Sequence, residues 1–288
     1  MIMEKKLHIA VQKSGRLHDE SLKLLKDCGV SFDNGKDQLK AVARNFPMEV
    51  FYLRNGDIPQ YLRDGVVDIA IIGENLLVEK GEGIDIIEKL GFSKCKVSLA
   101  VPKDDNYNGV QSLSGKKIAT SYPNTVKKYL KEVGVSADLH IINGSVEIAP
   151  NIGLSDAICD IVSSGSTLFK NNLKEVEVLF SSEAVLASGP SLSSEKQALL
   201  DKLQFRIQSV LKGRKSKYIL MNVPNESIEV ISSILPVLKS PTVMPLAEPG
   251  WSSLHSVINE GTFWDVIDQL KAAGAQDILV CPVEKMVL

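Results

Sequence analysis

Two aspartates precede a run of small hydroxylated residues near the middle of the chain. Asp156 directly precedes a short apolar stretch, and Asp160 lies within it. The stretch is followed by the turn Ser163, Ser164, Gly165, Ser166 and Thr167. Hydroxyls and free backbone N–H groups at a strand-to-helix turn favour a phosphate, and glycine lets the backbone approach it closely. Carboxylates accept hydrogen bonds from sugar hydroxyls. An ordinary N-capped turn uses the same residue types, but this order of acids and loop favours a phosphorylated-sugar site.

Four loops of this kind each follow a short apolar run and precede a helical pattern. The apolar runs cover residues 7–11, 68–72, 117–120 and 157–162. Their alternation with helical patterns predicts a parallel sheet with covering helices. Because ligands in open α/β sheets bind beyond the carboxyl ends of the strands, we expect the four loops to face one cleft.

The pattern changes after residue 217. It predicts strand 218–223, helix 228–238, strands 242–246 and 253–258, helix 262–273 and strand 277–283, with Gly274 ending the last helix. This β-α-β-β-α-β order is typical of a ferredoxin-like unit. The charged stretch 212–217 lacks apolar anchors and predicts a linker before a separate small domain.

Composition and charge exclude several classes of protein. With 33 basic and 35 acidic residues and 44% hydrophobic content, we expect a globular chain whose main partner is neither nucleic acid nor a membrane surface. The apolar segment near the start is broken by Gln12 and Lys13, so the sequence predicts no signal peptide or membrane span and a cytoplasmic location. The four cysteines have no metal-binding spacing, which favours reduced thiols.

The stretch from Glu147 to Thr167 resembles the signature of the ATP phosphoribosyltransferases. Residues 12–17, 54–59, 68–75 and 118–123 resemble further blocks of that family in the expected order, so the resemblance covers essentially the whole chain. The final domain is similar to the one that distinguishes the long, histidine-inhibited form from the short form. The resemblance implies an α/β fold with a two-lobe, periplasmic-binding-protein-like (type II) catalytic part and a C-terminal ferredoxin-like βαββαβ regulatory domain.

The resemblance also implies a reaction. N1 of the adenine of ATP would displace pyrophosphate from C1 of phosphoribosyl pyrophosphate, with Mg²⁺ held mainly by the diphosphate, in the first step of histidine biosynthesis. A transition state with oxocarbenium character and a departing diphosphate requires fixed positive charge and precise placement, whereas N1 already has a lone pair and needs no general base. Histidine and AMP would be inhibitors, and the chain would form a homo-oligomer, as dimer and hexamer.

The resemblance assigns residues to each role. The catalytic residues would be Asp156, Asp160 and Arg16. Phosphoribosyl pyrophosphate would contact Glu147, Asp156, Asp160, Ser163, Ser164, Gly165, Ser166 and Thr167. ATP would contact Lys13, Arg16, Arg54, Asp68, Gly73, Glu74, Lys96 and Tyr122.

Alternatives stay open for several of these residues. A cation such as Arg16 or Arg54 suits bidentate phosphate contact, yet it could be solvated or paired within the protein. Glu74 could instead cap a helix, Tyr122 could pack rather than stack on adenine, and Glu147 could pair with a lysine.

The resemblance further assigns histidine binding to Asn222, Leu238, Ser240 and Thr242. A proline-containing strand start is the alternative for the segment around Ser240, and Asn222 stands where some relatives have an acidic residue. The expected domain bounds are 1–96 with 183–212 for the first lobe, 97–182 for the second lobe with the phosphoribosyl pyrophosphate loop, and 213–288 for the regulatory domain.

Two functions of other classes compete with a transferase. The first is a bilobal binding or sensor protein that holds its ligand without turnover, against which the missing export signal and the phosphate loop both count. The second is an interaction protein whose front part has lost activity, which the presence of all the resembling loops disfavours.

Overall fold

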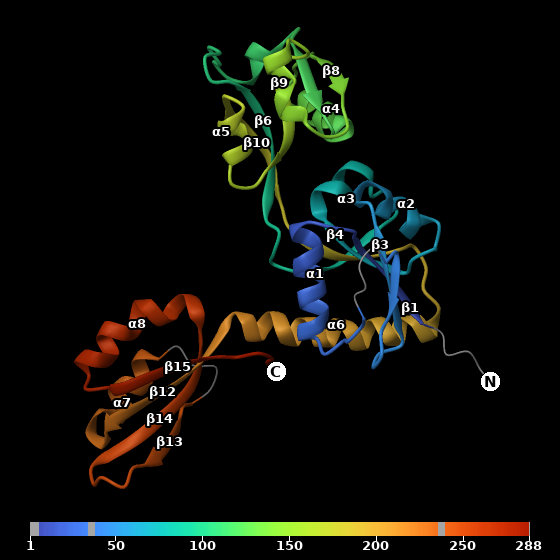
Figure 1. Ribbon diagram of the computed structural model, residues 1–288. Helices are drawn as coiled ribbons and strands as arrows, with labels where there is room; N and C mark the ends of the chain where they lie inside the picture. Colours follow the sequence, from blue (N-terminus) through green and yellow to red (C-terminus); the bar gives the residue numbers. More distant parts are fainter. Residues whose placement is uncertain (1–5, 34–37, 236–239, 288) are drawn as a thin grey trace, which may run out of the picture. The chain divides into compact units, whose positions relative to one another are not determined.

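The computed structural model describes residues 6–33, 38–235 and 240–287, which form two compact units (Figure 1). The larger comprises Met1–Lys23 and Val30–Leu200, and the smaller comprises Leu24–Gly29 and Asp201–Leu288. No helix in the described ranges is both long and apolar enough to cross a membrane.

The first sheet of the larger unit has six strands in the order β2-β3-β1-β4-β11-β5. The bounds are Leu7–Gln12 for β1, Lys40–Val42 for β2, Met48–Leu53 for β3, Ile69–Gly73 for β4, Asp85–Lys89 for β5 and Ala184–Ser188 for β11. β1 runs parallel to β3 and β4, but β2 and β11 are antiparallel to their neighbours. The sheet is therefore mixed, and the expectation of a purely parallel sheet is wrong.

The helices that follow these strands along the chain are α1 (Arg16–Asp27), α2 (Ile58–Arg63), α3 (Glu74–Lys80) and α6 (Ser194–Arg214). α1 and α3 lie where the sequence pattern predicted helices, whereas α2 and α6 were not predicted. Ala70 and Ile72 of β4 pack with Leu62 of α2 and Leu76 of α3 in one cluster of buried residues. Burial of these small and branched side chains fixes β4 and α3 against each other, and so fixes the turn between them.

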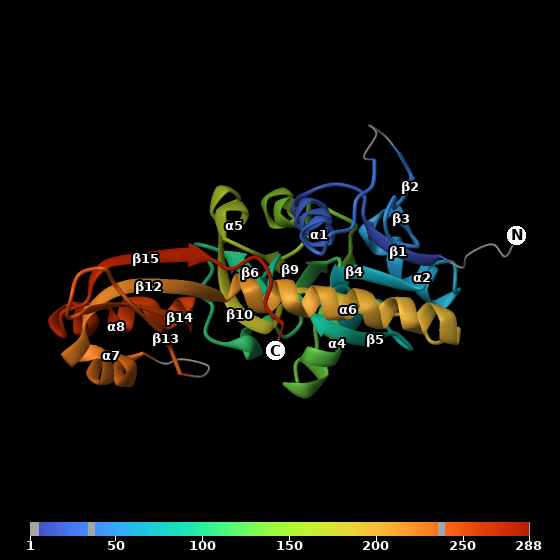
Figure 2. The same ribbon diagram turned by 90° about the horizontal axis from the view of Figure 1, so that it is seen from below.

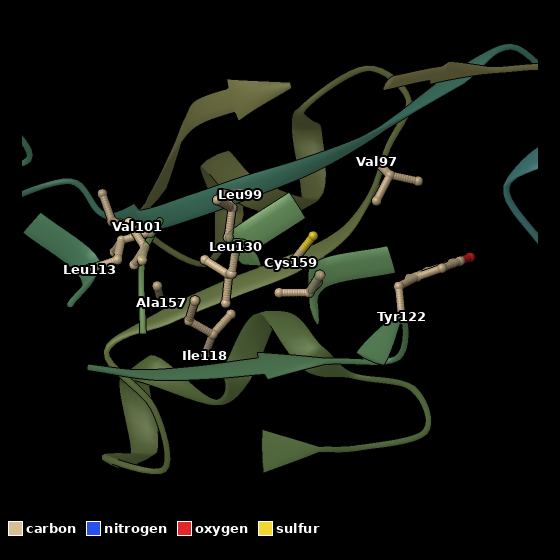
Figure 3. Packing of buried hydrophobic residues seen from close by; sticks show 11 residues of the cluster. Val97, Leu99, Val101, Leu113, Ile118, Tyr122, Leu130, Ala157 and Cys159 are labelled. Atoms are coloured by element: carbon tan, nitrogen blue, oxygen red, sulfur yellow. The ribbon is translucent and has the colours of Figure 1, made fainter. Parts of the chain in front are cut away.

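The second sheet has five strands in the order β10-β6-β9-β7-β8. The bounds are Cys95–Pro102 for β6, Lys117–Thr120 for β7, Asp138–Ile141 for β8, Ala157–Val162 for β9 and Leu173–Ser182 for β10, with α4 at Pro123–Glu132 and α5 at Ser166–Lys170. Alternate residues of β6 face opposite sides. Leu99 packs with Leu130 of α4 (Figure 3), and Ala100 belongs to the cluster that contains Leu168 of α5. The inner strands β6, β7 and β9 are covered on both faces, which explains why their buried residues are mainly apolar, whereas the edge strands β8 and β10 carry charged residues.

The chain passes twice between the two sheets of the larger unit. It leaves the first sheet after β5 and enters β6 at Cys95, and it returns from β10 at Ser182 into β11. Cys95 and Ser182 are register partners in the antiparallel β6–β10 pair. The two crossings therefore lie side by side, and the larger unit is a pair of α/β lobes of the type expected from the sequence.

The smaller unit contains a four-stranded antiparallel sheet in the order β13-β14-β12-β15. Its elements are β12 (Ser216–Pro224), α7 (Ile228–Ile234), β13 (Thr242–Pro245), β14 (Trp251–Asn259), α8 (Glu260–Ala272) and β15 (Gln276–Pro282). Both helices lie on one side of the sheet (Figure 2), where Met221 and Leu254 pack with Leu270. This confirms the βαββαβ order, and Gly274 has the left-handed φ of +98° expected after α8.

The predicted linker at 212–217 is wrong. α6 continues through Arg214 and β12 starts at Ser216, so helix and strand are almost contiguous. Gly213 is buried so tightly that a Cβ would lie 2.7 Å from the backbone of Glu284, and Arg214 forms an ion pair of 2.8 Å with Asp27. The charged residues anchor this stretch by specific contacts, which composition alone does not reveal.

Candidate functional site

Three adjoining cavities of the larger unit share one residue, Ser163. We name them by their characteristic residues. The loop cavity, about 100 Å³, is formed around the 163–167 turn. The lysine cavity, about 430 Å³, contains Lys89, Lys94 and Lys96. The arginine cavity, about 410 Å³, contains Arg16 and shares Cys95 with the lysine cavity. The candidate site is therefore one connected region.

The 163–167 turn has the geometry that its sequence suggests. β9 ends at Val162, Gly165 takes a left-handed φ of +73°, and α5 begins at Ser166. The Oγ atoms of Ser164 and Ser166 lie 3.0 Å apart. Of the residues predicted for this loop, those that line the loop cavity are Glu147, Asp160, Ser163, Ser164, Gly165 and Thr167, whereas Ser166 is exposed beside it.

Asp160 lies on β9 at the wall of the loop cavity. Its Oδ1 accepts hydrogen bonds from the backbone N–H of Ile161 (2.8 Å) and from the hydroxyl of Ser121 (3.2 Å). Burial raises the pKa of the Asp160 carboxyl above its ordinary value, and these hydrogen bonds and the nearby Glu147 modify that shift less strongly. Within the described residues Oδ2 has no hydrogen-bond partner, so one carboxyl oxygen remains for a ligand.

Asp156 does not share this site. It precedes the first residue of β9, at the opposite end of the strand from the turn, and its Oδ2 accepts a hydrogen bond of 2.8 Å from the backbone N–H of Lys117. Six strand residues separate it from the turn, a distance of roughly 20 Å at ordinary strand rise. We therefore remove Asp156 from the candidate site.

The arginine cavity brings together the loops of the first lobe. Gln12 and Arg16 come from the loop after β1, and Gly73 from the turn after β4. Arg16 is exposed, and its Nη2 donates to the backbone oxygen of Lys94 at 3.3 Å. Ser163 closes the cavity from the second lobe. The expectation that loops of both lobes face one cleft is met for this set.

The three lysines of the lysine cavity differ in their ion pairs. Lys89 pairs with Glu74 at 3.1 Å, and Lys96 pairs with Glu175 at 3.3 Å. Lys94 is exposed and has no ion pair within the described ranges. The predicted residues Glu74 and Lys96 are thus both at the cavity wall, each with a partner of opposite charge. Such partly exposed pairs are weak and can exchange for a ligand.

Asp68 is a structural residue and not a ligand. It lies just before β4, at the end of the strand opposite Gly73, and it is 7% exposed. Its carboxyl oxygens accept from the backbone N–H of His8 and from Nζ of Lys196, both at 2.8 Å. These partners satisfy it within the protein and favour a structural role over the predicted ATP contact.

Tyr122 is also a core residue. It is 6% exposed and belongs to the cluster around Leu99 and Leu130 (Figure 3), and its hydroxyl accepts a hydrogen bond of 2.7 Å from Nδ2 of Asn75. Burial raises the pKa of this phenol above its ordinary value. The enclosed ring favours packing over the predicted stacking on adenine.

The remaining predicted cations lie at the edge of the site. Lys13 and Arg54 are exposed, and neither lines the three cavities. Arg54 directly precedes Asn55, which does line the arginine cavity.

The predicted histidine-binding residues are partly placed. Asn222 is half-buried on β12 and donates from Nδ2 to Asp277 at 3.0 Å. Thr242 begins the edge strand β13 opposite His255, and Ser240 is exposed just before it. Leu238 lies outside the described residues.

Sequence reasoning missed several residues that the structure places at the site. Asn75, Ser98 and Ser182 are buried polar residues that line the cavities. A polar residue within an apolar strand, as Ser98 is within β6, was the available signal. Asn75 and Ser182 are joined by hydrogen bonds across 107 residues of sequence, which no local pattern reveals.

No cluster of three or more acidic, histidine or cysteine side chains that could hold a metal ion occurs in the part of the chain that the structure describes. Glu147 and Asp160 are the carboxylates at the loop cavity. A hard cation with mostly phosphate and water ligands fits such a sparse donor set.

Two family models match the chain. The model described as ATP phosphoribosyltransferase matches residues 54–209, and the one described as the HisG C-terminal domain matches residues 213–285. Together they cover the 163–167 turn, the lysine cavity and the four-stranded sheet of the smaller unit.

Curated relatives match over nearly the whole length. An ATP phosphoribosyltransferase of Cytophaga hutchinsonii is 58% identical over 98% of both chains. One of Phocaeicola vulgatus is 51% identical over 98% of this chain and 100% of the relative. Among solved structures, the ATP phosphoribosyl transferase (HisG:HisZ) complex from Thermotoga maritima is 32% identical, with a TM-score of 0.59, over 70% of this chain and 98% of that one.

Proposed function

Because the chain belongs to the ATP phosphoribosyltransferase family, we propose that its reaction takes place where the three cavities meet at Ser163. The enzyme transfers the phosphoribosyl group from phosphoribosyl pyrophosphate to N1 of ATP and releases pyrophosphate, the first step of histidine biosynthesis. The observation that carries the placement is the 163–167 turn with Asp160 at its wall.

Phosphoribosyl pyrophosphate binds with its 5-phosphate in the 163–167 turn. The free N–H groups and the hydroxyls of Ser163, Ser164 and Thr167 supply donors for the phosphate oxygens. Oδ2 of Asp160, which has no partner among the described residues, accepts a hydrogen bond from a ribose hydroxyl. Holding the ribose by both ends orients C1 toward the lysine and arginine cavities that adjoin at Ser163.

The nucleotide and the leaving diphosphate occupy the lysine and arginine cavities. Arg16, Lys94 and Lys96 provide positive charge beside the path from Ser163. Fixed cations stabilise the charge that develops on the departing diphosphate, and they need no reorganisation during the reaction. Lys13 and Arg54, exposed nearby, are secondary contacts in this scheme.

Enzymes of this family use a divalent metal, and we propose Mg²⁺. The described residues contain no cluster of three or more acidic, histidine or cysteine side chains, which fits an ion held mainly by the substrate's diphosphate. When bound, the ion neutralises charge on the leaving group.

The smaller unit is the regulatory part of the proposal. The expected bounds, 1–96 with 183–212 and 97–182 for the two lobes and 213–288 for the regulatory domain, are retained as proposals. Histidine binds near Asn222, Ser240 and Thr242, and histidine and AMP inhibit. The subunits assemble as a homo-oligomer, either dimer or hexamer. The match to the HisG C-terminal domain model over residues 213–285 and the similarity to relatives over nearly their whole length support this assignment.

The placement of the site is tested by three matched variants. Thr167→Ala should lower kcat/KM for phosphoribosyl pyrophosphate about 10- to 100-fold, the loss expected for a hydrogen bond to a charged group. Asp160→Asn should lower it similarly, whereas Asp156→Asn, at the other end of β9, should leave it near the wild-type value. Pyrophosphate release with ATP and Mg²⁺ is the measurement, and normal release by both Thr167→Ala and Asp160→Asn would refute the placement.

A further inference from the structure

The start of α4 is capped by a residue of the other lobe. The helix begins at Pro123, and its N-cap residue, Tyr122, makes no side-chain capping bond. The cap comes from Glu79 of α3, which is 4% exposed. Its Oε1 accepts from the backbone N–H of Asn124 (3.0 Å), and its Oε2 accepts from the backbone N–H and the hydroxyl of Thr125 (2.9 and 2.8 Å).

A second contact lies one turn earlier on α3. Asn75 is 4% exposed and donates from Nδ2 to the hydroxyl of Tyr122 at 2.7 Å. Its backbone N–H donates to Oγ of Ser182 at 2.9 Å, and that hydroxyl donates back to Oδ1 at 3.0 Å. Asn75 thereby joins α3, the start of α4 and the returning strand β10. Residue 73 must be glycine for this arrangement, since a Cβ there would lie 2.3 Å from Oδ1 of Asn75.

These contacts oppose separation of the lobes because a buried carboxylate is costly without partners. Within the described ranges Glu79 forms no ion pair, and its compensation comes from the N–H groups and the positive end of α4. Any shift of α4 away from α3 would break these charge-assisted hydrogen bonds. The two lobes are thus held at one separation by specific hydrogen bonds in addition to the two crossing segments.

We propose that Asn75 and Glu79 form an inter-lobe clasp that sets the distance between the nucleotide loops of the first lobe and the 163–167 turn of the second. The inference rests on the proposed function, which places the 5-phosphate and ribose on the second lobe and the nucleotide beside the loops of the first lobe. Both ends of the clasp connect to the site: Asn75 lines the arginine cavity, and Tyr122 follows Ser121, whose hydroxyl donates to Asp160. Glu79 lines none of the three cavities and acts as a positioning residue.

The clasp matters because attack by N1 on C1 requires close alignment, and a misplacement of about 1 Å can cost about 100-fold in rate. Loosening it should lower kcat while changing the affinity for phosphoribosyl pyrophosphate much less, because the 5-phosphate and ribose of that substrate are held by the second lobe. A residue that only stabilised the fold would lower the melting temperature without changing the turnover of the folded enzyme.

The first experiment compares Thr125→Val, which removes the hydroxyl bond to Glu79, with Thr125→Ser, which keeps it. Glu79→Ala removes the whole cap. We expect kcat to fall about 10-fold in Thr125→Val and up to about 100-fold in Glu79→Ala, with Thr125→Ser near the wild-type value. The dissociation constant of phosphoribosyl pyrophosphate, measured by titration calorimetry, should change less than about twofold. Leu130→Ala is the stability control, because Leu130 lies on α4 and packs into the core of the second lobe. It should lower the melting temperature with little effect on kcat at 25 °C.

The second experiment measures the lobe separation without substrates, so it does not depend on the assigned reaction. Spin labels at Val66→Cys and Ile141→Cys, exposed positions of the first and second lobe, report the distance between the lobes. The background carries Cys95→Ser and Cys281→Ser, so that these two cysteines are not labelled. Labelled protein is diluted with unlabelled protein, so that only distances within one chain are measured. Glu79→Ala should broaden the distance distribution, and Leu130→Ala should not. An unchanged distribution or an unchanged kcat in Glu79→Ala would overturn the clasp. Absence of pyrophosphate release by the wild-type chain would instead overturn the proposed function.

Discussion

Partners within the protein decide what each carboxylate of the larger unit can do. Asp68 is saturated by His8 and Lys196, and Glu79 by the start of α4. Asp160 keeps one oxygen without a partner among the described residues, at the wall of a cavity. Burial alone therefore does not identify a functional acid, but burial together with an unused acceptor does.

Replacement of Asp160 by asparagine should stabilise the protein while it lowers the activity. The folded-state pKa of this carboxyl is raised by burial, so the charged form is disfavoured by folding. That cost is fully present above the folded pKa and absent below the unfolded value of about 4. Asp160→Asn should therefore melt at a higher temperature at neutral pH, and the difference should vanish as the pH falls below about 4. Thermal scans at several pH values check this, and a lower melting temperature at neutral pH would contradict it.

Replacement of Asp68 should destabilise the protein and leave its substrate binding unchanged. Asp68→Ala leaves Lys196 and the N–H of His8 without their acceptor, which should cost about 2 kcal/mol of unfolding free energy after allowance for the partial exposure of the lysine. Denaturant titration measures this loss. Because Asp68 lies at the end of β4 away from the cavities, KM for ATP should stay unchanged, and a large rise would return Asp68 to the nucleotide site.

At the scale of helices and strands, local patterns were sufficient for some elements and not for others. The predicted bounds of β7 and β9 are those of the structure, because short apolar runs between turn residues leave few alternatives. The direction of β11 depends on how the chain returns from the second lobe, and the capping of α4 depends on Glu79, 44 residues before Pro123. Such long-range pairings are invisible to periodicity. The 163–167 turn is a local feature and could be predicted from the sequence. Asn75 and Ser182 could not, because their hydrogen bonds join distant parts of the chain. The positions of Asp156 and Asp68 at the far ends of their strands from the cavities were not predicted either.

The turn itself can be tested with two glycines of similar conformation. Gly165 and Gly153 have φ values of +73° and +72°, and neither has an atom near the position of a Cβ. Alanine at either position should cost about 1 kcal/mol in backbone strain. Only Gly165→Ala should also weaken phosphoribosyl pyrophosphate binding, because Gly165 lines the loop cavity and Gly153 does not. Calorimetric titration of the pair decides this, and equal affinities would place the substrate elsewhere.

At the scale of the whole molecule, a two-lobed unit holds the candidate site and a separate compact unit holds the ferredoxin-like sheet. The two family models match residues 54–209 and 213–285, so the boundary between them lies a few residues beyond the boundary of the compact units at Leu200. Separate cores allow each unit to keep its own fold, so regulation and catalysis should be separable by substitution.

Substitution in the smaller unit should remove feedback inhibition without loss of activity. Thr242→Val, at the start of β13, should raise the histidine concentration for half-inhibition at least tenfold, with kcat unchanged. Removal of residues 217–288 should abolish inhibition while turnover remains. Initial rates over a histidine series give both results. Retained inhibition in Thr242→Val would exclude this residue from the histidine site, and retained inhibition after the deletion would place that site in the larger unit.

A crystal structure with phosphoribosyl pyrophosphate bound tests the central claim most directly. The account predicts the 5-phosphate within the 163–167 turn, hydrogen-bonded to Thr167, and a ribose hydroxyl on Oδ2 of Asp160. Density for the substrate at another place, with the turn empty, would contradict it.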